Sequence, residues 1–348
     1  MLKPSLCGLT ADEIVDLIQP AGFNLAHALS ISNSIYKKKT SDISNISKIP
    51  SKLREELCGH LKSGIYPPAA LQVSADNSIK YLFRNEAGLE FETVYLPDGK
   101  RNTVCVSTQS GCRMRCSFCT TGRYGFHGNL TTCDIINQII GIPQAEKITH
   151  VVFMGMGEPM DNLDNVLKAC SIITAEWGLA ISPRNVTVST VGLIPGVIQF
   201  LEKSECNLTL SLYSPYPEER KKVIQAESEN PVTEIIDIMK NFRAKRKRRL
   251  SLAYLMVKDM NDTDSHLEEL KSILMGSAIR VNLLPYHSVL NDQICSSSAE
   301  RMQFFKHNLT VSGISASIRK SRGADISAAC GLLASGLKKR SMESGIIY

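Results

Sequence analysis

The sequence lacks a long apolar run, a secretory leader and a strong excess of either charge. No stretch approaches the roughly 18–20 apolar residues that span a bilayer, so we expect no transmembrane helix and no membrane partner. The first residues, MLKPSLCGLTADEIVDLI, place Asp12 and Glu13 inside the apolar periodicity, which disfavours a signal peptide. The net charge is only +6 over 348 residues, and 43% of the residues are hydrophobic, which excludes intrinsic disorder. We therefore expect a soluble, cytoplasmic protein.

Cysteine, in contrast, is abundant, with eleven residues. An odd number of cysteines in a cytosolic chain disfavours a disulfide framework and indicates thiols that act as ligands or reagents. A chain of this length also buries enough apolar surface to fold without covalent staples. A single cysteine is most often a small buried residue. Taken one by one, eight of the eleven have that interpretation: Cys7, Cys58, Cys105, Cys133, Cys170, Cys206, Cys295 and Cys330.

The first hundred residues differ in pattern from the rest of the chain. Apolar residues recur at helical spacing over 9–18 and 53–61, and Thr10 stands three residues before Glu13, as in a capping box. Strand-like stretches follow at 80–84 and 91–96. We expect a helical amino-terminal domain, a connecting segment with short strands, a main α/β domain and a basic tail, with bounds 1–75, 76–100, 101–335 and 336–348.

From residue 101 onward, β-branched apolar runs alternate with helical segments. The expected strands are 103–107, 149–154, 185–190, 207–212, 250–257 and 281–285, with a further candidate at 316–318. The expected helices between them are 132–142, 162–177, 197–203, 232–245, 264–274 and 299–311. Six strands with crossover helices predict an α/β fold with a parallel sheet curved into a partial (βα)6 barrel. Ligands of such sheets bind at the carboxyl ends of the strands.

Three cysteines follow the first of these strands at C-x3-C-x2-C spacing, as Cys112, Cys116 and Cys119. Soft thiolates at this spacing on a loop can hold one face of an iron–sulfur cluster and leave one iron open for a small molecule. Zinc is the alternative metal, with His127 as a fourth ligand. A protein stabilised by zinc would not need to be an enzyme.

Glycine and polar residues gather at the ends of the next strands. The second strand runs into Gly157-Glu158-Pro159, where a glycine allows close approach of a ligand to the backbone and a carboxylate can accept from an ammonium group. Ser189 and Ser211 end the third and fourth strands. Each of these residues alone would also suit a turn or a cap.

The complete set of motifs resembles the RlmN/Cfr family of radical S-adenosylmethionine (SAM) RNA methyltransferases over nearly the whole chain. The segments that carry the resemblance are FETVYLP, CVSTQSGCRMRCSFCTTG, NLTT, VVFMGMGEP, VSTVGLIPG, SLYSPY and RKSRGADISAACG. It implies a radical SAM barrel behind a small amino-terminal domain, which becomes a candidate for RNA binding. It also implies a [4Fe–4S] cluster on the three cysteines. SAM would contact Gly157, Glu158, Ser189, Ser211, Leu212, Tyr213 and His287. The family pattern has His in place of Tyr213 and Asn in place of His287.

The resemblance also gives roles to two cysteines outside the triad. In the family, a first SAM methylates the cysteine that matches Cys330. A second SAM, reduced by the cluster, supplies a radical that removes a hydrogen from this S-methyl group, and the resulting carbon radical adds to an adenine. A base, matched here by Glu92, takes the ring proton, and the thiol matched by Cys105 releases the product by forming a transient disulfide with Cys330.

The implied substrate is adenosine 2503 of 23S rRNA, and also adenosine 37 of some tRNAs, methylated at carbon-2. Carbon-8 methylation, as in Cfr, and a paralogue acting on another RNA are the alternatives. Flavodoxin is the type of electron donor expected, and the protein is expected to be a monomer. Basic segments at 37–39, 240–249 and 319–322 are candidate RNA contacts or solvated charges.

Overall fold

The computed structural model describes residues 3–242, 248–288 and 294–333. Its centre is a ten-stranded sheet of order β1-β2-β3-β4-β7-β8-β9-β10-β11-β12. The seven strands from β4 onward pair in parallel. They are β4 (Arg101–Cys105), β7 (His150–Phe153), β8 (Val186–Thr190), β9 (Asn207–Ser211), β10 (Leu250–Met256), β11 (Arg280–Pro285) and β12 (Ala316–Ile318). The predicted α/β fold with a parallel sheet is confirmed.

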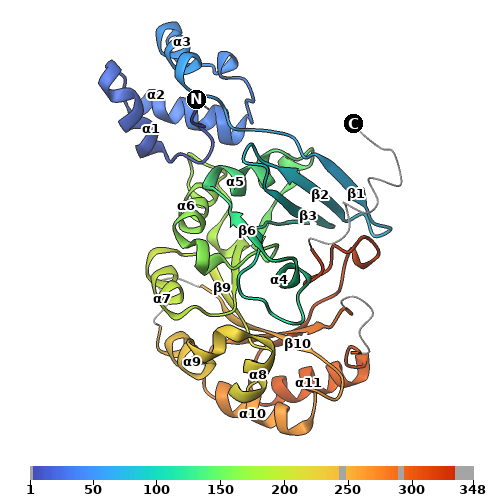
Figure 1. Ribbon diagram of the computed structural model, residues 1–348. Helices are drawn as coiled ribbons and strands as arrows, with labels where there is room; N and C mark the ends of the chain where they lie inside the picture. The colour runs from blue at the N-terminus through green and yellow to red at the C-terminus, as the bar shows by residue number, and fades with distance from the viewer. Residues whose placement is uncertain (1–2, 243–247, 289–293, 334–348) are drawn as a thin grey trace.

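The helices on the outer side of this sheet also agree with the sequence pattern. They are α5 (Thr132–Ile140), α6 (Leu163–Thr174), α7 (Ile194–Lys203), α9 (Val232–Asn241), α10 (Asp264–Leu274) and α11 (Ala299–Val311). Each begins within three residues of its predicted start, and Figure 1 shows them along one side of the sheet. Two short helices of the main domain, α8 (Pro217–Val223) and α4 (Thr120–Tyr124), were not predicted. Because each is less than two turns long, neither carries a clear helical period.

An antiparallel extension precedes the parallel strands. It consists of β1 (Ala70–Val73), β2 (Ile79–Arg84) and β3 (Glu90–Asp98), and β3 pairs with β4. The predicted short strands at 80–84 and 91–96 are β2 and β3. Since β1 already pairs with β2, the sheet begins at residue 70, within the segment expected to be helical.

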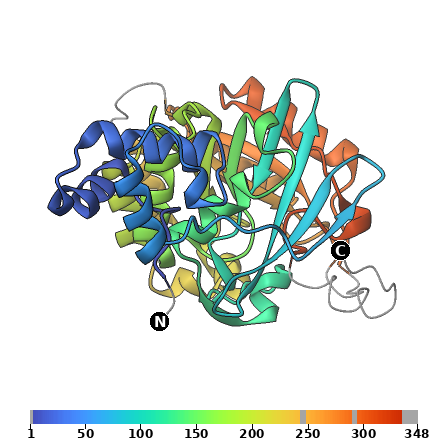
Figure 2. The ribbon, with the colours of Figure 1, turned by 90° about the horizontal axis from the view of Figure 1, so that it is seen from above.

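The amino-terminal helices are α1 (Ala11–Ile18), α2 (Leu25–Ser32) and α3 (Ser51–His60), and α1 has the predicted Thr10–Glu13 capping box. Figure 2 shows this part next to α5 and α6 and away from the carboxyl-terminal strands. Lys168 on α6 pairs with Glu13 at 2.6 Å, and the Tyr66 hydroxyl donates to Asp134 on α5 at 2.7 Å. No described helix is long and apolar enough to cross a membrane.

Candidate active site

A small hairpin holds the loop that carries the three spaced cysteines. Its strands, β5 (Gln109–Gly111) and β6 (Phe126–Asn129), stand before and after the loop and were not predicted. The Cys112 amide donates to the Gly125 carbonyl at 3.0 Å. Gly111 has φ +81°, and a Cβ there would lie 1.6 Å from the Gly125 carbonyl oxygen, so the closure of the loop requires glycine.

The three thiols of this loop lie near one another at the carboxyl end of β4. Cys112 and Cys116 are buried and Cys119 is half-buried. Burial, together with the nearby Glu158 and Cys119, raises the pKa of Cys112 to about 12. The Met114 amide points at the Cys112 sulfur at 3.5 Å, a contact that stabilises a thiolate ligand.

The histidine considered as a fourth zinc ligand does not join the three thiols. Among the described residues, no group of three or more His, Cys, Asp or Glu side chains is spaced to hold one ion. A zinc ion needs its sulfur ligands at about 2.3 Å from one point, whereas an iron–sulfur cluster is larger. His127 is exposed, packs on Tyr124 and contacts the Tyr124 carbonyl with Nε2 at 3.3 Å. The residues therefore fit a cluster better than the zinc site considered from the sequence.

Glu158 lies buried at the end of β7, where it connects two neighbouring strands. Its carboxylate accepts from the Met160 amide at 3.0 Å, from the Val191 amide at 2.9 Å and from the Thr190 hydroxyl. Burial nevertheless raises its pKa to about 7. Gly157 before it has φ +99°, and a Cβ there would meet the Gln109 Cβ at 2.6 Å. The turn thus needs glycine, and Glu158 fixes the ends of β7 and β8.

The other residues expected to contact SAM lie at the ends of the following strands. Ser189 and Ser211 face each other with hydroxyl oxygens 3.5 Å apart. Leu212 is fully buried, and Tyr213 adopts a left-handed φ of +64° and stacks on Phe118 of the cysteine loop with ring centroids 5.7 Å apart. His287 follows β11, and its Nε2 lies 2.8 Å from the Ser321 hydroxyl.

The structure brings Cys105 and Cys330 to the same place from opposite ends of the main domain. Burial raises the pKa of Cys105 to about 12, with a further rise from the neighbouring Cys330 and an opposing effect of Arg319. Cys330 is exposed and lines a cavity of about 710 Å³ inside the sheet's curve. The next residue, Gly331, accepts from the Thr120 amide at 2.8 Å, so the Cys330 segment is attached directly beside Cys119.

Glu92 on β3 is also buried, and its carboxylate lies 3.6 Å from the ammonium of the buried Lys80 on β2. One strand away, the Ser107 hydroxyl donates to the Glu92 carbonyl at 2.5 Å. Val94, two residues further along β3, pairs with Cys105 on β4. Alternate residues of a strand share a face, so the Glu92 side chain lies on the same face of β3 as Val94, the residue that pairs with Cys105.

Comparisons with known proteins agree with this geometry. Residues 106–271 match the Radical SAM superfamily. The chain is 42% identical to a probable dual-specificity RNA methyltransferase RlmN of Phocaeicola vulgatus, over 99% of this chain and 98% of that protein. It is also 42% identical to the corresponding protein of Parabacteroides distasonis, over 95% and 96%. The structure of a radical SAM methyltransferase from Sphaerobacter thermophilus matches with TM-score 0.87 and 32% identity, over 94% and 98% of the two chains.

The chain belongs to the RlmN family of radical SAM RNA methyltransferases. Its fold is the radical SAM fold, its cofactors are a [4Fe–4S] cluster and SAM, and the alternative of a non-catalytic zinc protein is wrong. The open position that a three-thiolate site leaves on a four-iron cluster suits a small chelating ligand. In this chain, Cys112, Cys116 and Cys119 would hold the cluster, and the ends of β7, β8 and β9 would hold SAM.

Arg220 on α8 is a site residue that sequence reasoning missed. Its side chain is fully buried and donates to the carbonyls of Ser211 and Leu212 after β9 and to that of Val191 after β8. It also pairs with the buried Glu227. Arg220 thus fixes two strand ends beside the cysteine loop. Its only sequence signal was its position four residues after the last residue of SLYSPY.

Gln109 is the second residue that was missed. It is fully buried, accepts from the Glu158 amide at 2.9 Å and donates to Asn129 and to Asp161 at 2.8 and 2.7 Å. Asp161 in turn accepts from Arg113 of the cysteine loop at 2.8 Å. One glutamine therefore connects the cysteine hairpin with the glycine turn after β7. It lies within the TQSGC segment of the motif, which was used only for its cysteine.

The basic segments proposed as RNA contacts fall in different surroundings. Lys38 donates to the Ser47 hydroxyl and Lys39 pairs with Glu146, so these two charges are already partnered. Of the 240–249 run, residues 243–247 lie outside the described residues. The segment 319–322 lines the cavity that contains Cys330.

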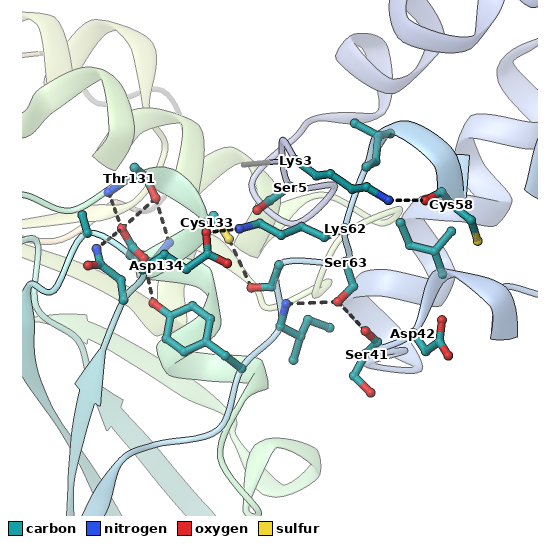
Figure 3. A pocket seen from close by; sticks show the side chains of 18 residues that line it. Lys3, Ser5, Ser41, Asp42, Cys58, Lys62, Ser63, Thr131, Cys133 and Asp134 are labelled. Atoms are coloured by element: carbon teal, nitrogen blue, oxygen red, sulfur yellow. Dashed lines mark hydrogen bonds and ion pairs between the residues drawn. The ribbon is translucent and has the colours of Figure 1, made fainter. Parts of the chain in front are cut away.

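A second cavity, of about 700 Å³, lies between the amino-terminal helices and α5 (Figure 3). Two lysines enter it, and both have partners: Lys3 donates to the Cys58 carbonyl at 2.7 Å, and Lys62 pairs with Glu86. Cys133 faces it and contacts the Gly64 carbonyl. Its walls carry charges of both signs, among them Lys3, Lys62, Asp42, Glu86 and Asp134, so it differs from the mostly basic cavity at Cys330.

Proposed function

We propose that this radical SAM RNA methyltransferase methylates carbon-2 of adenosine 2503 in 23S rRNA and of adenosine 37 in some tRNAs. The observation that supports the proposal is the pair Cys105 and Cys330, which are close enough for Cys330 to raise the pKa of Cys105. Cys330 lines the cavity, and its neighbour Gly331 is bonded to Thr120 beside the cysteine loop. A thiol that accepts a methyl group must be reachable by SAM and then by the base, and an exposed Cys330 in a cavity meets both needs.

The cluster with its bound SAM would supply the hydrogen-abstracting radical. The chain's own groups do the rest. The Cys330 sulfur receives a methyl group and presents its carbon to the adenine. Glu92 takes the proton from the ring carbon, and the ammonium of the buried Lys80 lies 3.6 Å from its carboxylate.

Cys105 completes the cycle as the resolving thiol. Before this step the adduct radical must give up one electron, which the oxidised cluster would accept. The Cys105 thiolate then attacks the Cys330 sulfur, the S–S bond forms as the bond between sulfur and the transferred carbon breaks, and that carbon takes a proton to become the methyl group. An external dithiol must then reduce this disulfide before the next turnover. Burial raises the pKa of Cys105 to about 12, so its proton must be removed before the sulfur can attack. We expect a low-potential one-electron donor such as flavodoxin.

The test is mass spectrometry after reaction of the reconstituted, oxygen-free holoenzyme with SAM and an RNA fragment. We expect an S-methyl group on Cys330 and 2-methyladenosine in the RNA. Cys330→Ala should give neither, and Cys105→Ala should leave RNA covalently attached to the protein. Methylated RNA from the Cys330→Ala variant would refute the mechanism, and 8-methyladenosine from the wild type would assign the Cfr-type activity instead.

A further inference from the structure

Basic residues begin five of the seven parallel strands. Arg101 starts β4, His150 starts β7 and Arg280 starts β11. Arg249 immediately precedes β10, and Arg184 lies in the 3-10 turn Pro183–Asn185 that leads into β8. Because parallel strands share one amino-terminal edge, these side chains gather at one end of the sheet's inner face. All five line the 710 Å³ cavity that contains Cys330. We call these five residues the amino-end ring.

The charges of the amino-end ring repel one another and have little local compensation. Burial lowers the pKa of Arg101, and the nearby Arg319 and Arg249 lower it further, with only Asp98 opposing. Burial, Arg101 and Arg249 likewise lower the pKa of His150. Within the described ranges, none of the ring arginines has a carboxylate oxygen within 4.0 Å of its guanidinium. A concave site lined by one sign of charge focuses its field on an anion.

The cavity between the amino-end ring and Cys330 is polar. A closed barrel would be filled by branched aliphatic side chains, but the wall of this cavity carries hydroxyl and amide groups. These groups belong to Thr103, Thr187, Thr209, Ser251, Asn282 and Ser317. Such groups suit the hydrogen-bonding edges of a ribose and a base. Cys105 stands four residues after Arg101 on β4, and at the rise of an extended strand their Cα atoms are about 13 Å apart. This is roughly the reach of a nucleotide from its phosphate to the far edge of its base.

We propose that the amino-end ring binds backbone phosphates of the substrate RNA, so that the target nucleotide enters from the amino ends of the strands and extends its base toward Cys330. The proposal rests on the proposed function. It assigns the two ends of the cavity to different partners: RNA at the amino ends of the strands, and the cluster with SAM at their carboxyl ends. Phosphate contacts of this kind position an RNA without reading its sequence.

The test compares two variants that each lose three positive charges. In one, Arg101, Arg249 and Arg280 are replaced by Gln; in the control, Lys221, Lys271 and Lys306 on the outer helices α8, α10 and α11 are replaced by Gln. The dissociation constant of an RNA hairpin with a central unpaired adenosine is measured for the reconstituted proteins as salt increases. For single-stranded phosphate contacts, loss of three should reduce the slope of log K against log salt by about 2.

We expect the ring variant to bind the hairpin at least tenfold more weakly and with the reduced slope, and the control to bind like the wild type. S-methylation of Cys330 by SAM alone, which needs no RNA, should be unchanged in both. An equal effect of the two variants, or no effect of the ring variant, would overturn the proposal. The proposal would also be wrong if the ring variant lost its binding of inorganic tripolyphosphate but bound the hairpin like the wild type. If the wild type itself bound no RNA and formed no S-methyl group, the proposed function would fail instead.

Discussion

Replacement of Arg220 should test how the SAM end of the sheet is held together. The guanidinium is fully buried, donates to carbonyls that follow β8 and β9, and pairs with Glu227. Arg220→Met keeps much of the side-chain volume but leaves these carbonyls and a buried carboxylate without their donor. Loss of one partner of a buried ion pair costs about 3–5 kcal/mol, since the remaining charge stays desolvated.

The structure also provides the controls for this experiment. In Arg220→Met with Glu227→Gln, no charge is left unpaired, so the double variant should be less destabilised than the sum of the two single changes. Arg84 pairs with Glu90 at 2.6 Å, but 61% of its side chain is exposed, and Arg84→Met should cost less than about 1 kcal/mol.

Urea unfolding of the apoprotein under anaerobic conditions gives the free-energy changes, and equilibrium dialysis of the reconstituted protein gives the SAM affinity. With a slope of about 3 kcal/mol per molar urea, Arg220→Met should lower the midpoint by about 1 M or more and weaken SAM binding as well. If Arg220→Met were no more destabilising than Arg84→Met, or if the double variant showed simple additivity, the role given to Arg220 would be wrong.

Three further substitutions follow from the same site and its support. Burial raises the pKa of Glu158 from 4.5 to about 7, so ionisation of this carboxyl should destabilise the apoprotein by about 3 kcal/mol as the pH rises between these values. Glu158→Gln should remove that part of the pH dependence of thermal unfolding. An unchanged pH profile in the variant would contradict this effect of Glu158. Gly157→Ala should weaken SAM binding and cost more stability than Gly88→Ala, because Gly88 also has a positive φ but nothing lies within 4 Å of a Cβ there. Equal losses of stability would refute the close contact between position 157 and Gln109. Tyr66→Phe removes a 2.7 Å hydrogen bond to Asp134 and should cost about 1 kcal/mol in urea unfolding, with no effect on Cys330 methylation.

The sequence predicted the main sheet well because its strands and its helices each bury an apolar face against the other. Strands such as β8, with apolar residues at 186 and 188, and amphipathic helices such as α9 carry local periods that a sequence displays directly. The β5–β6 hairpin carries no such period. Its strands are three and four residues long, and they pair because Gly111 permits a close crossing near Gly125.

For the predicted site residues, the sequence motifs indicated which residues gather at the site but not the interactions that each one makes. The resemblance to a family placed Cys105, Cys330 and the three loop cysteines together, and the fold has them at one end of the sheet. The carboxylate of Glu158, predicted to contact SAM, also accepts from two amides and a hydroxyl of the chain itself. A motif records which residue is present but not whether its side chain or its backbone faces the ligand.

The residues that sequence reasoning missed share a physical property. Arg220, Gln109 and Asn261 are fully buried polar side chains, and each satisfies backbone groups or polar partners on other elements; Asn261, for example, donates to the carbonyls of Tyr213 and Leu255, both at 2.7 Å. Such a residue has no period, and its partners are distant in the chain. Since these side chains fix the strand ends themselves, their loss should reduce stability and SAM affinity together. Loss of the Cys330 thiol, which faces the cavity, should abolish methyl transfer while the fold persists, and this separation distinguishes the groups that react from those that hold them in place.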